Sequence, residues 1–79
     1  MVTVRYFAGA RAAAGRDHDD VPAGSLDELV EALLRTHGDR LGRVLSASSF
    51  LVDGLVCHDR GAPLPPGATV DVLPPFAGG

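Results

Sequence analysis

The strongest constraint on the fold is a single amphipathic helix that begins at a capping box. Ser25 and Glu28 give the pattern Ser-x-x-Glu, in which the serine oxygen accepts from the N3 amide and the glutamate reaches back to the N-cap amide. Apolar residues then recur at helical spacing and form one face (Leu26, Leu29, Val30, Leu33 and Leu34). We expect the helix to end near Thr36 and His37, with Gly38 in the left-handed C′ position. Such a helix must bury its face against another layer.

The segment before the helix predicts a hairpin. From Val2 to Ala8 apolar and polar side chains alternate, as in a half-buried strand, and Phe7 falls on the polar face, either covered or left as a contact point. Residues 10–14 favour a short helical turn that Gly15 ends, and residues 16–21 can pair as a second strand. Its acidic cluster suits an exposed edge that resists aggregation (Asp17, Asp19 and Asp20).

The segment after the helix predicts a second hairpin. Residues 41–45 continue the apolar periodicity as a shorter helical piece, and residues 46–49 are expected to form a loop. Two apolar runs, 50–52 and 55–57, then flank Asp53-Gly54, a strong hairpin signal because both turn residues tolerate positive φ.

A last strand completes the pattern. Pro65-Pro66-Gly67 is a turn, residues 69–73 form a strand rich in β-branched side chains, and Pro74-Pro75 must stop the sheet because proline cannot donate to the ladder. The order is hairpin, helix, hairpin, strand. It predicts an α+β roll, a mixed sheet of about five strands packed on one main helix with the first and last strands parallel at its centre. This is the β-grasp arrangement.

Length and composition exclude several classes of function. The 79 residues fit one domain, which we place at residues 1–75, followed by a flexible tail at 76–79. The net charge of −3 argues against a nucleic-acid partner. Cys57 is the only cysteine, and no stretch approaches the length of a membrane span, so a cytoplasmic protein is expected. The chain has no lysine, which removes P-loop and Schiff-base chemistry.

The last four residues are the candidate site. Phe76, Ala77, Gly78 and Gly79 have nothing to bury or pair, so we expect them to project from the domain. Glycine lacks a Cβ atom and can thread a narrow channel. A free glycine carboxylate is also the least hindered acyl group that a protein can offer.

The whole chain resembles the small subunit of molybdopterin synthase and the related thiamine sulfur carriers. The resemblance rests on residues 2–7 followed by Arg11, on the helix opened by Ser25 and on the hairpin around Asp53-Gly54. Its most specific part is the end of the chain, Val70-Asp71-Val72-Leu73-Pro74-Pro75-Phe76-Ala77-Gly78-Gly79. Two departures are Gly67-Ala68-Thr69 where Gly-Asp-Glu is usual, and Asp53 where asparagine is common.

The resemblance implies a sulfur carrier. An ATP-dependent activating enzyme of the ubiquitin-activating type would adenylate the Gly79 carboxylate, and sulfur would then replace AMP to leave a thiocarboxylate. The large subunit of molybdopterin synthase, or an equivalent acceptor enzyme, would receive the tail and pass the sulfur to a pyranopterin precursor of molybdenum cofactor. The chain itself would bind no cofactor and act as a non-catalytic subunit.

Other functions stay open at this point. Relatives with the same fold and diglycine end serve thiamine synthesis, cysteine synthesis or the synthesis of another sulfur-containing metabolite. A ubiquitin-like modifier that joins Gly79 to lysines of other proteins would use the same activation chemistry. A non-covalent interaction module with an incidental tail is a third class.

A docking patch near the tail is expected because a carrier must bind at least two partners through one surface. Its candidates are Phe7, Leu73, Pro75, Phe76 and Ala77. The resemblance adds Arg11, which matches a position that contacts the activating enzyme in relatives and is otherwise a solvated arginine.

Two other groups of residues are interpreted as structural and not as catalytic or metal-binding. Cys57 on an apolar strand is expected to be a small buried hydrophobe, and its neighbour His58 would point to the opposite face. His18 beside aspartates suits an exposed edge better than a metal site, so no metal is predicted.

Overall fold

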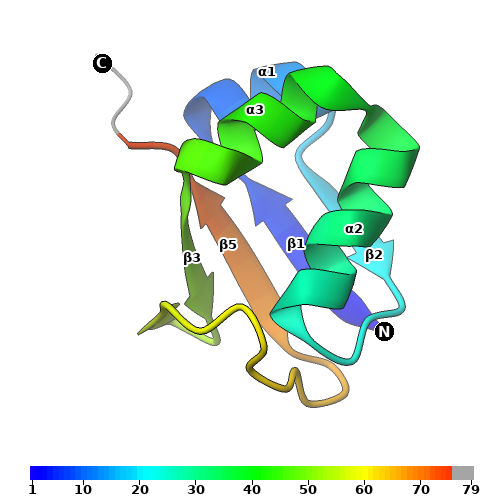
Figure 1. Cartoon of the computed structure of the whole chain (residues 1–79), viewed down its shortest axis with the longest axis vertical. Helices are drawn as coiled ribbons and strands as arrows, with labels where there is room; N and C mark the ends of the chain where they lie inside the picture. The colour runs from blue at the N-terminus through cyan, green and yellow to red at the C-terminus, as the bar shows by residue number, and fades with distance from the viewer. Residues whose placement is uncertain (76–79) are drawn as a thin grey trace.

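The chain forms a five-stranded mixed sheet with its helices laid across one face (Figure 1). The computed structural model describes residues 1–75, so the predicted tail at 76–79 lies outside the described residues. The elements in chain order are β1 (Val2–Tyr6), α1 (Ala8–Ala14), β2 (His18–Val21), α2 (Leu26–His37), α3 (Asp39–Ala47), β3 (Ser49–Val52), β4 (Leu55–Cys57) and β5 (Thr69–Leu73). No helix among the described residues is both long and apolar enough to cross a membrane.

The sheet has the order β2-β1-β5-β3-β4. The two central strands, β1 and β5, run parallel, with Val4 opposite Val70 and Tyr6 opposite Val72. All other neighbours are antiparallel. The prediction of a β-grasp roll with the first and last strands parallel at the centre is therefore confirmed.

Helix α2 begins at the predicted capping box, with one difference. Ser25 Oγ accepts from the Glu28 amide at 3.2 Å, as expected. The Glu28 carboxylate accepts from the amide of Gly24 at 2.8 Å and not from that of Ser25, so it binds one residue earlier than predicted. At the other end Gly38 has a positive φ of 80°, but its ψ of −164° is extended, because α3 starts at the next residue.

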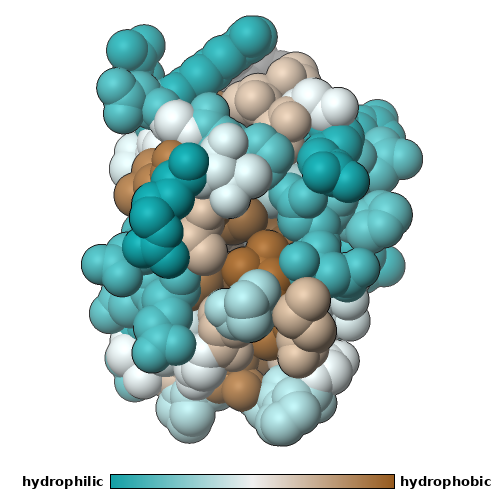
Figure 2. Space-filling model, turned by 90° about the vertical axis from the view of Figure 1, so that its right-hand side faces the viewer, coloured by the Kyte–Doolittle hydropathy of each residue, from teal (hydrophilic) through white to brown (hydrophobic). Residues whose placement is uncertain are grey.

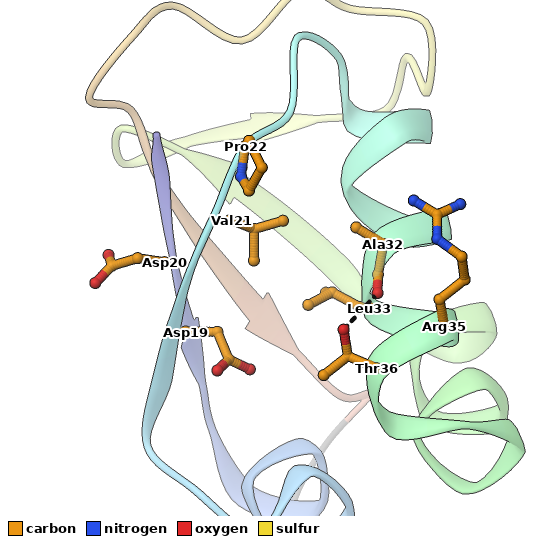
Figure 3. Close-up of a pocket in the computed structure, with 8 residues that line it drawn as sticks. All are labelled: Asp19, Asp20, Val21, Pro22, Ala32, Leu33, Arg35 and Thr36. Carbon is orange, nitrogen blue, oxygen red and sulfur yellow. Dashed lines mark hydrogen bonds between the residues drawn. The ribbon is translucent and has the colours of Figure 1, made fainter.

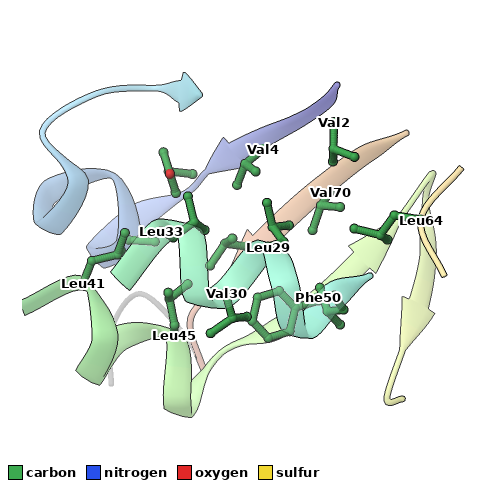
Figure 4. Close-up of a cluster of buried hydrophobic side chains, with 14 residues drawn as sticks. Val2, Val4, Leu29, Val30, Leu33, Leu41, Leu45, Phe50, Leu64 and Val70 are labelled. Atoms are coloured by element: carbon green, nitrogen blue, oxygen red, sulfur yellow. The ribbon is translucent and has the colours of Figure 1, made fainter. Parts of the chain in front are cut away.

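The core lies between α2 and the two central strands (Figure 4). Four of the five predicted apolar residues of α2 are buried, whereas Leu34 is 39% exposed. Leu34 turns toward α3 because Gly42 leaves room there: a Cβ atom at Gly42 would lie 2.6 Å from a Leu34 methyl carbon. Leu64, in the loop before β5, is also buried, and no periodic pattern marked it.

Three predicted boundaries were wrong. Strand β1 ends at Tyr6, because Phe7 takes the N-cap position of α1 and the helix starts at Ala8, earlier than the expected turn at 10–14. The predicted loop at 46–49 is reduced to one residue, since α3 continues to Ala47 and β3 begins at Ser49. These connections are short because α1 packs against β1 and β5, and α3 packs against α1 and α2.

The edge strand β2 differs from the fully exposed acidic edge that was predicted. Asp19 points to the helical side of the sheet, and its side chain is only 11% exposed. It accepts a hydrogen bond from the Tyr6 hydroxyl at 2.7 Å, lies 2.7 Å from Nε2 of His37 and pairs with Arg16 at 3.0 Å. Asp20, one residue on, points to the opposite face and is exposed, because side chains alternate along a strand.

Candidate carrier terminus and docking face

Strand β5 delivers the C-terminal segment from the centre of the sheet. It is paired on both sides, with β1 and with β3, and its last residue, Leu73, lies opposite Ser49. Pro74 is half-buried and Pro75 is exposed, so the chain leaves the sheet as the prolines predict. This exit is at the end of the sheet opposite the N-terminus (Figure 1). The predicted site residues Gly79, Gly78, Phe76 and Ala77 lie outside the described residues.

The outer face of the sheet carries a charged pair at its centre. Arg5 on β1 donates from Nε and Nη2 to the two carboxylate oxygens of Asp71 on β5, at 2.6 and 2.8 Å. The hydrogen bonds from Arg5 to Asp71, reinforced by the Asp71 charge, raise the pKa of Arg5. Asp71 is only 7% exposed although it is charged. The bidentate geometry satisfies this carboxylate and fixes the direction of the Arg5 side chain.

Phe7 stands beside this pair at the same end of the sheet as the exit of β5. Its ring is 40% exposed, and the guanidinium carbon of Arg5 lies 5.7 Å from the ring centroid. The next residue, Ala8, has a φ of 48°, in the left-handed region that L-residues rarely adopt. This turn directs the chain from β1 into α1 and leaves the Phe7 ring outside the core. Exposed aromatic and guanidinium groups together are typical of protein interfaces.

The structure brings some predicted docking residues together and separates others. Phe7 and Arg11 line one open pocket of about 250 Å³. Arg11 pairs there with Asp17 at 3.3 Å, with both side chains largely exposed. Leu73 is half-buried on the outer face and does not line this pocket. The complete lining is Thr3, Arg5, Tyr6, Phe7, Arg11, Asp17 and His18.

The cysteine does not form a reactive centre with its neighbours. Cys57 is half-buried, packs against the core and donates from Sγ to the backbone oxygen of Asp59 at 3.4 Å. His58 is exposed, in agreement with the prediction that successive side chains point apart. Within residues 1–75, no group of three or more histidine, cysteine or acidic side chains is arranged to hold a metal ion.

Sequence reasoning missed two polar contacts that shape this surface. The pair between Arg5 and Asp71 joins residues 66 positions apart. A carboxylate in the middle of an otherwise apolar central strand was the available signal, because such a group needs a partner. The cluster of Tyr6, Asp19 and His37 gave no comparable signal, since Asp19 is one of three aspartates that look alike in the sequence.

The parallel central strands, the antiparallel outer strands and the single long helix packed on one face define a ubiquitin-like β-grasp protein. Residues 4–79 match the model of the ThiS family. The chain belongs to this family of ubiquitin-like sulfur carriers. A comparison with curated proteins found no match.

Several solved structures are similar over nearly the whole chain. A putative molybdopterin converting factor subunit 1 from Pyrococcus furiosus is 26% identical, with a TM-score of 0.80 over 95% of this chain and 97% of that one. The complex of subunits 1 and 2 of molybdopterin-converting factor from Helicobacter pylori contains a chain that is 26% identical, with a TM-score of 0.73 over 99% and 97%. Small archaeal modifier protein 1 from Methanosarcina acetivorans shares the fold, with a TM-score of 0.86 at 20% identity over 99% and 95%.

Proposed function

We propose that this chain carries sulfur as a thiocarboxylate on Gly79 and delivers it to a pyranopterin precursor in the synthesis of molybdenum cofactor. The observation that supports this most directly is the placement of β5. The strand is anchored between two neighbours and is followed by Pro74-Pro75 at the edge of the domain, two residues before the diglycine. A strand fixed in the sheet and followed by six residues would present a C-terminal carboxylate to another protein.

The chemistry requires a partner that binds ATP. A carboxylate is resonance-stabilised and repels nucleophiles, so its oxygen must first become part of a good leaving group. In the proposed cycle a Gly79 oxygen attacks the α-phosphorus of ATP and pyrophosphate leaves. A sulfide-level nucleophile then adds to the acyl carbon and AMP leaves. The chain has no lysine for phosphate binding, so the activating enzyme must supply the nucleotide site.

Docking would place the carboxylate in each enzyme in turn. We assign this role to the outer face at the exit of β5, where Phe7 and Leu73 lie beside the pair of Arg5 and Asp71. The exposed ring of Phe7 supplies apolar area that a partner can cover. The complex of the two converting-factor subunits from Helicobacter pylori is a precedent in a relative for assembly with a second subunit.

Mass spectrometry of the intact chain tests the proposal. Co-expression with an activating enzyme and a sulfur donor should give a species in which one oxygen of Gly79 is replaced by sulfur, located by fragmentation to the last residue. Extension of the chain by one alanine after Gly79 should abolish this species. The circular dichroism spectrum should stay that of the folded domain, because the helices and strands end before the tail. Sulfur incorporation in the extended chain would refute the proposal.

Three further measurements distinguish this proposal from its alternatives. If the chain is a protein modifier, digestion of cell extracts should yield Gly79 joined to lysines of other proteins, and sulfur loading would be only an intermediate. If the chain serves thiamine or cysteine synthesis, the loaded form should transfer sulfur to those acceptors and not to the pyranopterin precursor. Activity retained after deletion of Gly78-Gly79 would favour a non-covalent interaction module.

A further inference from the structure

A second candidate binding surface lies at the edge of the sheet farthest from β4, between β2 and α2. A hollow opens on this side of the molecule, with apolar side chains at its floor between more polar flanks (Figure 2). It has a volume of about 250 Å³. Val21 of β2 and Leu33 of α2 point toward one another across it, and Ala32 lies beside Leu33 (Figure 3). The rest of its lining is Asp19, Asp20, Pro22, Arg35 and Thr36.

The backbone of β2 is open along this hollow. The Tyr6 amide donates to the Asp17 carbonyl at 2.9 Å, and the same register continues with Val4 opposite Asp19 and Val2 opposite Val21. Because backbone groups alternate in direction along a strand, His18 and Asp20 direct their N–H and C=O groups away from β1. Both residues are exposed, and β2 is a terminal strand of the sheet. Two donors and two acceptors are therefore free to pair with another strand.

We propose that β2 and the adjacent hollow bind an extended segment of a partner protein, which adds to the sheet as a sixth strand. The alternation of side chains specifies the sequence of this segment. A side chain on the helical side would enter the hollow over Val21 and Ala32, which are both half-buried, and should be apolar. A side chain on the outer side would lie beside Asp20 and should be basic. The expected ligand is thus an alternating apolar and basic peptide.

The charges at this edge favour a basic segment as the partner. The Asp20 carboxylate accepts from the Thr3 hydroxyl at 2.8 Å, but no cationic side chain within residues 1–75 pairs with it. The neighbouring Asp19 is already neutralised by Arg16. A basic side chain would supply the missing opposite charge. A second copy of this chain is a poor occupant, because edge-to-edge pairing of two β2 strands brings their aspartates together.

This surface and the docking face at the exit of β5 lie mainly on opposite faces of the sheet, and they adjoin at His18, which also lines the outer pocket. Strand β1 lies between β2 and β5, and the hollow is on the helical side of the sheet, whereas Phe7 and Arg5 are on the outer side. The inference goes beyond the sulfur chemistry and does not depend on it.

The test is a titration of the ¹⁵N-labelled full chain with a synthetic peptide of alternating valine and lysine, three of each, with both ends blocked. Binding at millimolar peptide should shift the amide signals of His18, Asp20, Ala32 and Leu33. The same peptide methylated on its backbone nitrogens should not bind, because it cannot pair with the strand. A peptide of alternating valine and glutamate should bind more weakly than the basic one. Equal binding of the methylated peptide, or shifts confined to other surfaces, would overturn the proposal.

A charge variant with a matched control tests the role of Asp20. Asp20→Asn keeps the acceptor for Thr3 but removes the charge. It should lower the affinity for the basic peptide about two- to five-fold, the usual range for an exposed ion pair. Asp39→Asn makes the same change in net charge at an exposed residue that does not line the hollow, and affinity should stay unchanged. Equal weakening by both variants would show a non-specific charge effect and refute the assignment. These outcomes are independent of sulfur loading at Gly79.

Discussion

Oδ2 of Asp19 lies 2.7 Å from Nε2 of His37, and this contact ties the edge strand β2 to the last turn of α2. The Tyr6 hydroxyl donates to the same oxygen at 2.7 Å. The rings of Tyr6 and His37 also meet edge to face, with centroids 6.0 Å apart. Three elements, β1, β2 and α2, are therefore joined through one carboxylate. The stability of this corner should depend on the charge of Asp19.

The first prediction concerns acid stability. Burial alone would raise the pKa of Asp19, but hydrogen bonds from His37 and Tyr6, together with the Arg16 charge, outweigh it and hold the pKa below the ordinary aspartate value. A lowered folded pKa gives stability that is present above about pH 4, the unfolded value, and is lost as pH falls through the folded value. Urea unfolding measured across acidic pH should therefore show a loss of stability that Asp19→Asn largely removes.

The variant Asp19→Asn should also be less stable than the natural chain at neutral pH. Asp19→Asn replaces charge-assisted hydrogen bonds and should lower the free energy of unfolding by about 1–3 kcal/mol. The difference from the natural chain should shrink on acidification. Asp20→Asn is the matched control at an exposed position and should change stability by less than about 0.5 kcal/mol. Equal effects of the two variants would contradict the assigned role of Asp19.

The second prediction concerns the tyrosine. Burial of the phenol, followed by its hydrogen bond to Asp19, raises the pKa of Tyr6. Because the folded state holds this proton more tightly, its stabilising effect is complete below about pH 10, the unfolded value, and is lost at higher pH. Tyr6 is the only tyrosine, so tyrosinate absorbance reports on it alone. The absorbance should rise only together with unfolding monitored by circular dichroism. A rise in the folded chain near pH 10 would contradict the contact.

The third prediction concerns the turn after Phe7. Ala8 has a φ of 48°, which costs an L-residue about 1–2 kcal/mol. Glycine removes that cost but adds its usual entropy loss of about 0.5–1 kcal/mol, so Ala8→Gly should be neutral or slightly stabilising. Ala12→Gly, at an exposed position within the same helix α1, should destabilise by about 0.5–1 kcal/mol. The change in unfolding temperature relative to the natural chain should therefore be negative for Ala12→Gly and close to zero or positive for Ala8→Gly.

The main elements could be predicted because their signals are local. The capping box at Ser25, the alternation in β1 and the turn at Asp53-Gly54 each depend on residues within a few positions of one another. Positive φ at Asp53 and Gly54, of 49° and 86°, agrees with the turn that the sequence predicts. The candidate Gly79 was also read from local sequence. It lies outside residues 1–75 and stays a prediction.

The contacts that shape the surface could not be predicted because they depend on register. Arg5 meets Asp71 only when β1 and β5 pair in parallel with these residues opposite. A shift of one strand by one residue would put the two side chains on opposite faces of the sheet. Asp19 reaches His37 only because α2 ends beside β2. The position of the end of α2 relative to β2 depends on how the helix packs on the sheet, and no residue spacing in the sequence indicates it.

The last prediction tests the docking face against the rest of the sheet. Phe7 and Leu55 are both exposed apolar side chains, but Phe7 lies at the exit of β5, whereas Leu55 follows the hairpin turn near the start of β5. Phe7→Ser should weaken binding of the activating enzyme, measured as a higher carrier concentration for half-maximal exchange of pyrophosphate into ATP. A well-packed interface aromatic contributes about 1–3 kcal/mol, so the increase should be about 5- to 150-fold.

Leu55→Ser removes a side chain that is 74% exposed and should leave this concentration unchanged. Both variants should unfold at nearly the same temperature as the natural chain, because neither side chain belongs to the buried core. This comparison separates docking from stability: a carrier that loses activity through unfolding would lose its folded signal as well. Equal exchange by both serine variants would place the docking face elsewhere, because the proposed cycle needs the activating enzyme to bind the domain close to the point where the tail begins.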